Sequence, residues 1–108
     1  MMENKPICEI DKYRTKRWFL NGIYHREDGP AIEYNDGTKV WFKCGATHRL
    51  DGPAIIYHDG RVNWCVNGYS IMNIIENWAK ENNIDLDNLT DIDKALIKLV
   101  WSDYVPQT

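Results

Sequence analysis

A tandem repeat with a period of 23 residues constrains this chain more than any other feature. Trp18, Trp41 and Trp64 fall at this spacing, and aligning residues 18–40 with residues 41–63 keeps 13 of the 23 positions identical. A third copy starts at Trp64 and stops at Ser70. A repeat of this length is typical of supersecondary units that bury a core by stacking on one another. The identical pairs are Trp18/Trp41, Phe19/Phe42, Gly22/Gly45, His25/His48, Arg26/Arg49, Asp28/Asp51, Gly29/Gly52, Pro30/Pro53, Ala31/Ala54, Ile32/Ile55, Tyr34/Tyr57, Asp36/Asp59 and Gly37/Gly60.

Each unit carries the pattern of a β-hairpin. In the first unit, two short apolar-rich runs at residues 31–34 and 38–42 flank Asn35-Asp36-Gly37, and the second unit repeats the turn as His58-Asp59-Gly60. Residues of this kind between apolar runs indicate a tight turn.

The differences between the two units fix the register of the hairpins. Glu33 and Lys39 of the first unit become Ile56 and Val62 in the second, so a charged pair is replaced by an apolar pair. This exchange indicates that the two positions face each other across the strands. That register requires a three-residue loop with a left-handed glycine, and it sets small residues opposite tryptophans. The glycines are Gly37 and Gly60, and the pairs are Ala31 with Trp41 and Ala54 with Trp64.

The hairpins are joined by the segment His25-Arg26-Glu27-Asp28-Gly29-Pro30-Ala31, which returns as residues 48–54. Proline removes a ladder donor and aspartate accepts from nearby amides, so this segment predicts a corner. We expect the corner residues Asp28, Gly29, Pro30, Asp51, Gly52 and Pro53 to serve the geometry of the turn. The alternative is functional: His25, Arg26, His48 and Arg49 could form a ladder of cations for an anionic ligand such as a nucleotide.

These corners (HRxDGPA), turns (YxDG) and W-x-x-x-G motifs resemble MORN and MORN-like (YwqK-type) repeats, in the HRxDGPA variant found in bacteriophages and giant viruses. The resemblance covers Trp18 to Ser70 and departs from the pattern at Cys44, which replaces Asn21. It implies an elongated antiparallel sheet of successive hairpins. It also implies contacts with proteins and sometimes lipids, or an antitoxin-like role, and it carries over no catalytic residue.

After residue 69 the apolar period changes to that of a helix. The first stripe comprises Ile71, Ile74, Ile75, Trp78 and Ala79, with Ser70 as the expected cap and Asn82-Asn83 at the end. A second helix is expected to begin at Thr90, where Thr-Asp-Ile-Asp forms a capping box, and to bury Ile92, Ala95, Leu96, Leu99 and Val100. Trp78 and Trp101 also lie 23 residues apart, which we interpret as chance because no other repeat position accompanies them.

The sequence therefore predicts one domain, 1–108, that is mainly β with α. It comprises an N-terminal segment (1–17), MORN-like hairpin repeats (18–69) and a helical tail (70–108). The tail should cover the apolar second unit at Ile56, Val62 and Trp64. The first unit then stays open as a partner-binding face that comprises Trp18, Glu33, Tyr34, Lys39 and Trp41. Alternatively, the aromatic residues simply fill a thin, curved core.

Charge and cysteine usage narrow the class further. The formal charge is −3, and residues 70–108 carry three Lys or Arg against seven Asp or Glu. The basic run comprises Lys12, Arg14, Lys16 and Arg17. It could be a phosphate-binding patch, but a solvated edge strand is the simpler interpretation, so direct nucleic-acid binding is not expected. Three cysteines without a CxxC pair indicate reduced, buried thiols, and scattered cysteines and histidines predict no metal site. Without a leader or an apolar span, we expect a cytoplasmic protein, in the host cytoplasm if it is viral.

We expect no enzymatic activity and no cofactor. His25 beside Asp28 and its copy, His48 beside Asp51, form the available catalytic constellation, and active sites are rarely duplicated within one chain. The leading interpretation is a phage-type or viral accessory protein that binds a host protein stoichiometrically, in defence or nucleic-acid machinery, and inhibits it. Binding would use the open hairpin face or an exposed edge strand. The alternatives are a sponge for a small anionic signalling nucleotide and a structural homo-oligomer.

Overall fold

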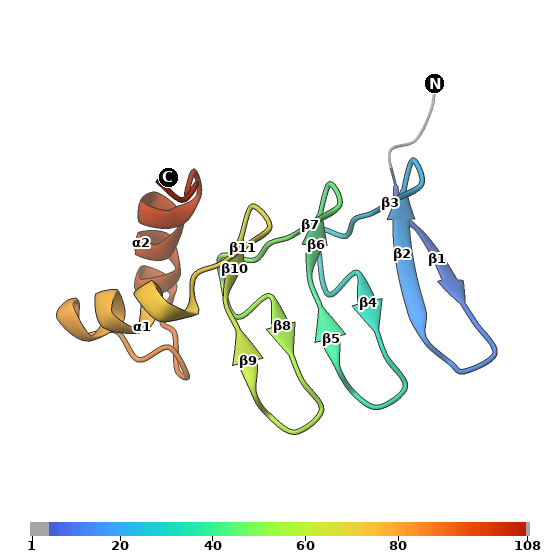
Figure 1. Ribbon diagram of the computed structural model, residues 1–108, viewed down its shortest axis with the longest axis horizontal. Coiled ribbons are helices and arrows are strands. Elements are labelled where there is room, and N and C mark those ends of the chain that lie inside the picture. Colours follow the sequence, from blue (N-terminus) through green and yellow to red (C-terminus); the bar gives the residue numbers. More distant parts are fainter. Residues whose placement is uncertain (1–4, 108) are drawn as a thin grey trace.

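The computed structural model describes residues 5–107 and shows a mainly antiparallel β-structure followed by two helices. Figure 1 shows the hairpins standing side by side in chain order, with β1 at one end and both helices at the other. The expected class, mainly β with α, is confirmed. The strands are β1 (Ile7–Ile10), β2 (Lys16–Leu20), β3 (Ile23–Tyr24), β4 (Ile32–Glu33), β5 (Lys39–Val40), β6 (Phe42–Lys43), β7 (Ala46–Thr47), β8 (Ile55–Ile56), β9 (Val62–Asn63), β10 (Cys65–Val66) and β11 (Tyr69–Ser70), and the helices are α1 (Met72–Glu81) and α2 (Asp91–Trp101).

The strands form a lower and an upper tier (Figure 1). In the lower tier, the main sheet runs in the order β1-β2-β4-β5-β8-β9, and β3 also pairs with β2. The upper tier holds the β2-β3 end and two small sheets, β6-β7 and β10-β11. Trp41 separates β5 from β6 and Trp64 separates β9 from β10, so these tryptophans lie where the chain passes from one tier to the other.

Next to their loops, the lower hairpins have the predicted register: Glu33 pairs with Lys39, and Ile56 pairs with Val62. The expected opposition of Ala31 to Trp41 and of Ala54 to Trp64 is not found, because Ala31 N–H donates to Val40 O and Ala54 N–H donates to Asn63 O. Tyr34 N–H donates to Thr38 O at 2.9 Å, which closes a three-residue loop, and the second hairpin repeats this contact. Both loop glycines are left-handed, with φ of +96° and +92°. The predicted loop length and the conformation of the glycines are therefore confirmed.

The upper hairpins close with two-residue turns of a different kind. Asn21-Gly22, Cys44-Gly45 and Asn67-Gly68 all have positive φ at both positions, which is the geometry that favours Asn-Gly. Cys44 adopts φ of +51° there, although a side chain of its kind rarely does. Successive turns are tied together, because the N–H of each following glycine donates to the preceding hairpin at 2.9 Å.

The helices close the end of the molecule at the third, incomplete copy. Their cluster joins Trp64 and Val66 of the third copy to Ile75 and Trp101 of the helices, and it also includes Ile71. The largest members of this cluster are almost entirely buried, whereas β1 at the opposite end is exposed along its whole length. The structure thus has one apolar cap, and it lies at the C-terminal end.

Two details of the helices differ from the sequence-based expectation. Ser70 belongs to β11 and donates to Asn63 Oδ1, so α1 begins after Ile71 without a side-chain cap. In α2 the capping box of Thr90 and Asp93 is confirmed, but the expected stripe is wrong. Ile92 and Leu99 are each 81% exposed, and α2 instead buries Ile97 and Trp101. Trp101 turns the helix this way because it packs edge-on against Trp78 at 5.7 Å.

Other expected burials are corrected as well. Val62 is exposed and Ile56 only half-buried, because the helices cover the upper tier and leave the lower hairpins uncovered. Among the cysteines, Cys65 is buried, whereas Cys8 and Cys44 are exposed on an edge strand and on a turn. The expectation of buried thiols therefore holds for Cys65 alone.

Candidate functional site

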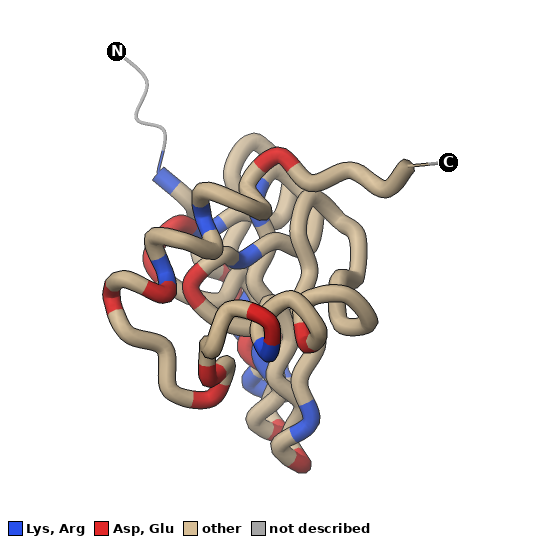
Figure 2. Tube along the Cα trace, turned by 90° about the vertical axis from the view of Figure 1, so that its left-hand side faces the viewer, with Lys and Arg blue, Asp and Glu red and all other residues tan. Residues whose placement is uncertain are grey.

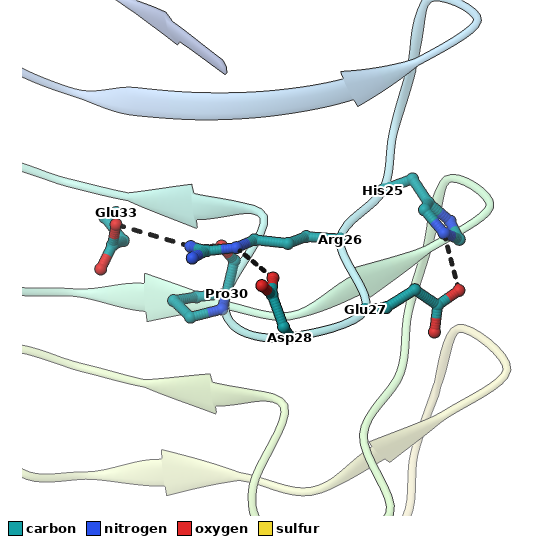
Figure 3. A network of polar contacts seen from close by, with 6 residues as sticks. All are labelled: His25, Arg26, Glu27, Asp28, Pro30 and Glu33. Carbon is teal, nitrogen blue, oxygen red and sulfur yellow. Dashed lines mark hydrogen bonds and ion pairs between the residues drawn. The ribbon is translucent and has the colours of Figure 1, made fainter. Parts of the chain in front are cut away.

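Each repeated arginine is enclosed by its own corner. The Arg26 guanidinium lies 3.9 Å from the centroid of the Trp18 ring. Its Nε donates to Asp28 Oδ1 at 2.9 Å, and its Nη1 donates to the carbonyl oxygen of Pro30 at 3.0 Å. Figure 3 shows Arg26 with Asp28 and Pro30, together with Glu33, whose carboxylate lies farther away at 3.8 Å. Arg26 therefore contacts an aromatic ring, a carboxylate and the backbone of the turn that it closes.

The second unit repeats this corner closely. Arg49 lies 3.9 Å from the Trp41 ring centroid and donates to Asp51 Oδ1 at 2.8 Å and to the Pro53 carbonyl at 3.1 Å. Burial would raise the pKa of Asp51, but the hydrogen bond and charge of Arg49 outweigh burial and lower it.

Glycine is required in these corners because of close approach. A Cβ on Gly29 would lie 2.9 Å from Arg26 Cζ, and one on Gly52 would lie 2.7 Å from Arg49 Cζ. Neither glycine needs a left-handed backbone. The guanidinium is held between the indole on one side and the glycine backbone on the other, so a side chain at the glycine would displace it.

Each repeated histidine joins one unit to the next. Nδ1 of His25 accepts the backbone N–H of Cys44 at 2.9 Å, and Nδ1 of His48 accepts that of Asn67 at 3.0 Å. In both cases the donor residue lies 19 positions after the histidine, in the upper turn of the following unit. Because Nδ1 must be unprotonated to accept, the neutral ring carries its proton on Nε2.

The two histidines differ at Nε2. His25 is only 6% exposed, and its Nε2 contacts Glu27 Oε1 at 2.8 Å. Leu50 stands at the matching position of the second unit, so His48 lacks this carboxylate. Burial lowers the pKa of His48, and the charge of Lys43 lowers it further, while Glu27 opposes both. His48 is therefore held in its neutral form.

In the third copy, apolar residues replace the repeated histidine and arginine. Seven and eight residues after Trp64, where the earlier units have histidine and arginine, the chain has Ile71 and Met72. Ile71 N–H still donates to Trp64 O at 2.7 Å, as the histidines donate to their own tryptophans at 3.1 Å. The corner thus continues for one residue beyond Ser70 and then becomes α1.

The predicted ligand ladder is only partly assembled. Arg26, His48 and Arg49 line one cavity of about 570 Å³ between the two corners, but His25 is buried away from it. Within the described chain both arginines form ion pairs with the aspartates of their corners. These contacts favour the interpretation of the corner residues as parts of the turn.

The predicted partner-binding face is divided. Glu33, Tyr34 and Lys39 line a shallow depression of about 260 Å³, where Arg14 and Lys16 join them. Trp18 and Trp41 do not line it: one guanidinium group lies over each of their rings, and Trp41 instead lines the cavity between the corners.

Sequence reasoning allowed for binding at an exposed edge strand but did not place that edge at β1. Within residues 5–107, β1 pairs with β2 alone, and Ile7 and Ile10 are 69% and 63% exposed. A depression of about 440 Å³ adjoins it and is lined by Ile7, Phe19 and neighbouring residues. The available signal was the short run Ile-Cys-Glu-Ile before Asp11, which lies outside the repeat and was treated as part of an N-terminal segment.

Other site types can be tested on residues 5–107. Within that range no three His, Cys, Asp or Glu side chains come together as a metal-binding group. Neither described helix has the length and apolar character needed to cross a membrane. Comparison with protein families, curated proteins and solved structures found no match.

Proposed function

We propose that this chain is a non-enzymatic protein-binding module that accepts an extended segment of its partner on the β1 edge. The single observation that carries the proposal is this edge: within residues 5–107, the outer side of β1 pairs with no other strand, carries two exposed isoleucines and lies at the end away from the helices. Exposed edges of this kind are templates for strand addition, and natural sheets usually protect them.

The hydrogen-bonding groups of β1 support strand addition. Asp11 N–H donates to Thr15 O, and Trp18 N–H donates away from β1 to Ala31 O. Antiparallel ladders alternate, so in β1 the backbone groups of Ile7 and Glu9 point to β2 while those of Cys8 and Ile10 point outward. Two donors and two acceptors are therefore available to an incoming strand.

Charge favours a foreign acidic strand over a second copy of this chain. Residues 5–17 carry five cationic side chains against two carboxylates. Two copies that met edge to edge would bring like charge together, whereas an acidic segment would be attracted. The helical end has the opposite character, and Figure 2 shows acidic positions along it.

The biological role belongs to the same proposal. Resemblance of the corners and turns to MORN-like repeats of bacteriophages and giant viruses supports a viral accessory protein, acting in the host cytoplasm. Strand addition would inhibit a host protein stoichiometrically by occupying its segment. A structural homo-oligomer is less favoured because residues 5–17, around the β1 edge, carry a net positive charge, and mass measurement at high concentration distinguishes the two.

Capture from host lysate tests the edge, with Ile10→Pro as the diagnostic variant. Proline removes the outward amide of β1 without removing a bond to β2, so the fold should persist and binding should be lost. Ile92→Lys is the matched control, since Ile92 is an exposed isoleucine on α2. Equal recovery of the same partner by wild type and Ile10→Pro, with both proteins folded, would refute the proposal.

A further inference from the structure

We infer that the cavity between the two corners and α2 binds a small molecule through its phosphate group, with Lys43, His48 and Lys98 as donors. The cavity measures about 570 Å³, which lies in the range of about 300–1,000 Å³ typical of small-molecule sites. It shares no residue with the β1 edge, so this inference is independent of the proposed function.

The charges that line the cavity leave two cations unpaired. Arg26 pairs with Asp28, Arg49 pairs with Asp51, and Glu27 contacts His25. Within residues 5–107, Lys43 and Lys98 line the same cavity and neither forms an ion pair. They come from β6 and from the last turn of α2, so the fold places two lysines that are far apart in the chain around one cavity.

His48 supplies a directed donor beside these lysines. Its Nδ1 is occupied by the Asn67 amide, so the neutral ring presents Nε2–H, and no described residue hydrogen-bonds to that atom. In the first unit the matching nitrogen is occupied by Glu27, whereas here Leu50 leaves it free. The free Nε2 of His48 therefore results from one difference between the two repeats, Leu50 in place of Glu27.

The surroundings favour a small phosphate ligand over a nucleic-acid backbone. Two lysines and one neutral histidine match a single phosphate group, whereas a nucleic-acid backbone is bound through many phosphate contacts along a longer basic surface. A second depression of about 400 Å³ also borders Lys43, His48 and Leu50, which leaves space for the organic part of the ligand.

Titration with inorganic phosphate, followed by the ring signals of His48 in an NMR spectrum, tests the site. We expect a saturable shift at His48, none at His58 in the β8–β9 loop, and a rise in the pKa of His48 when phosphate is bound. Lys43→Ala and Lys98→Ala should each weaken binding by about tenfold or more, since each removes a charge-assisted hydrogen bond. Lys39→Ala, at an exposed lysine outside the cavity, is the control and should bind as wild type.

The outcomes separate a site from general salt effects. A shift that stays linear with concentration, that chloride reproduces at equal ionic strength, or that survives in Lys98→Glu would overturn the inference. Lys98 is exposed on α2, so its variants should keep the native amide spectrum. A saturable shift that Lys98→Arg retains and Lys98→Glu abolishes would support it.

Discussion

At the scale of single residues, the residues that are identical in the two corners contact one another. The arginine needs the tryptophan face and the aspartate, and the glycine is needed because the guanidinium lies against its backbone. The sequence alone predicted a corner, and it also predicted that the repeated residues serve that corner. It did not predict the histidine contacts, because the accepted amide lies 19 residues away in the next unit.

Gly52→Ala tests the close approach. The new Cβ would lie 2.7 Å from Arg49 Cζ, so we expect the free energy of unfolding to fall by about 1–3 kcal/mol, as in an overpacked site. Denaturant unfolding measures the change.

Removing the arginine supplies the control for this substitution. In an Arg49→Ala background there is no guanidinium for the Cβ to displace. Gly52→Ala should then lower the free energy of unfolding by well under half as much as it does in wild type. Equal costs in both backgrounds would show that Gly52 is required for a reason other than Arg49.

His48 also predicts a pH dependence of stability. Its folded-state pKa is lowered, with burial as the main cause and Lys43 as the next, so the unfolded chain binds the extra proton more readily. Its contribution to stability is present above the unfolded-state pKa of about 6.5 and is lost as the pH falls through the folded-state value.

Replacement by an acceptor that does not titrate isolates this contribution. His48→Asn can still accept the Asn67 amide through its side-chain oxygen, so the decline in unfolding free energy below about pH 6.5 should become shallower than in wild type. Unfolding curves at successive pH values provide the measurement. An unchanged slope would contradict the role given to His48.

At the scale of elements, the hairpins were predictable and the orientation of α2 was not. Turn residues and the Glu33–Lys39 exchange specify loop length and register locally. In α2, apolar residues occur around most of the helix, so periodicity does not decide which of them is buried. The packing of Trp101 against Trp78 and Tyr104 decides it, and that is a tertiary contact.

The upper turns provide a prediction at this scale. Cys44 occupies a left-handed position that its counterparts fill with asparagine, at φ of +51° against +53° and +52°. Cys44→Asn should therefore raise the free energy of unfolding by up to about 1 kcal/mol, because asparagine tolerates this conformation better. Cys44→Val should lower it, because a β-branched residue tolerates positive φ least. A thermal or denaturant series of the three proteins compares them directly, and the reverse order would refute the account of the turn.

At the scale of the whole molecule, the two ends differ in covering and in charge. The C-terminal end is closed by two helices over an apolar cluster, and the N-terminal end presents β1. Stacked repeats usually need a cap at each end, and among residues 5–107 nothing covers the outer edge of β1, which is why we propose that a partner completes the sheet there. The sequence predicted that the helices cover Ile56, Val62 and Trp64, and of these only Trp64 belongs to the apolar cluster under the helices. The position of the open edge at β1 was missed because no repeat marks it.

Amide hydrogen exchange of the complex with its captured partner tests strand addition at β1 most directly. Because the amides of Cys8 and Ile10 point away from β2, we predict that both gain strong protection when the partner binds, while Glu33 and Lys39 exchange as in the free protein. Protection gained in the lower hairpins or the helices, with Cys8 and Ile10 exchanging as before, would contradict binding at the β1 edge.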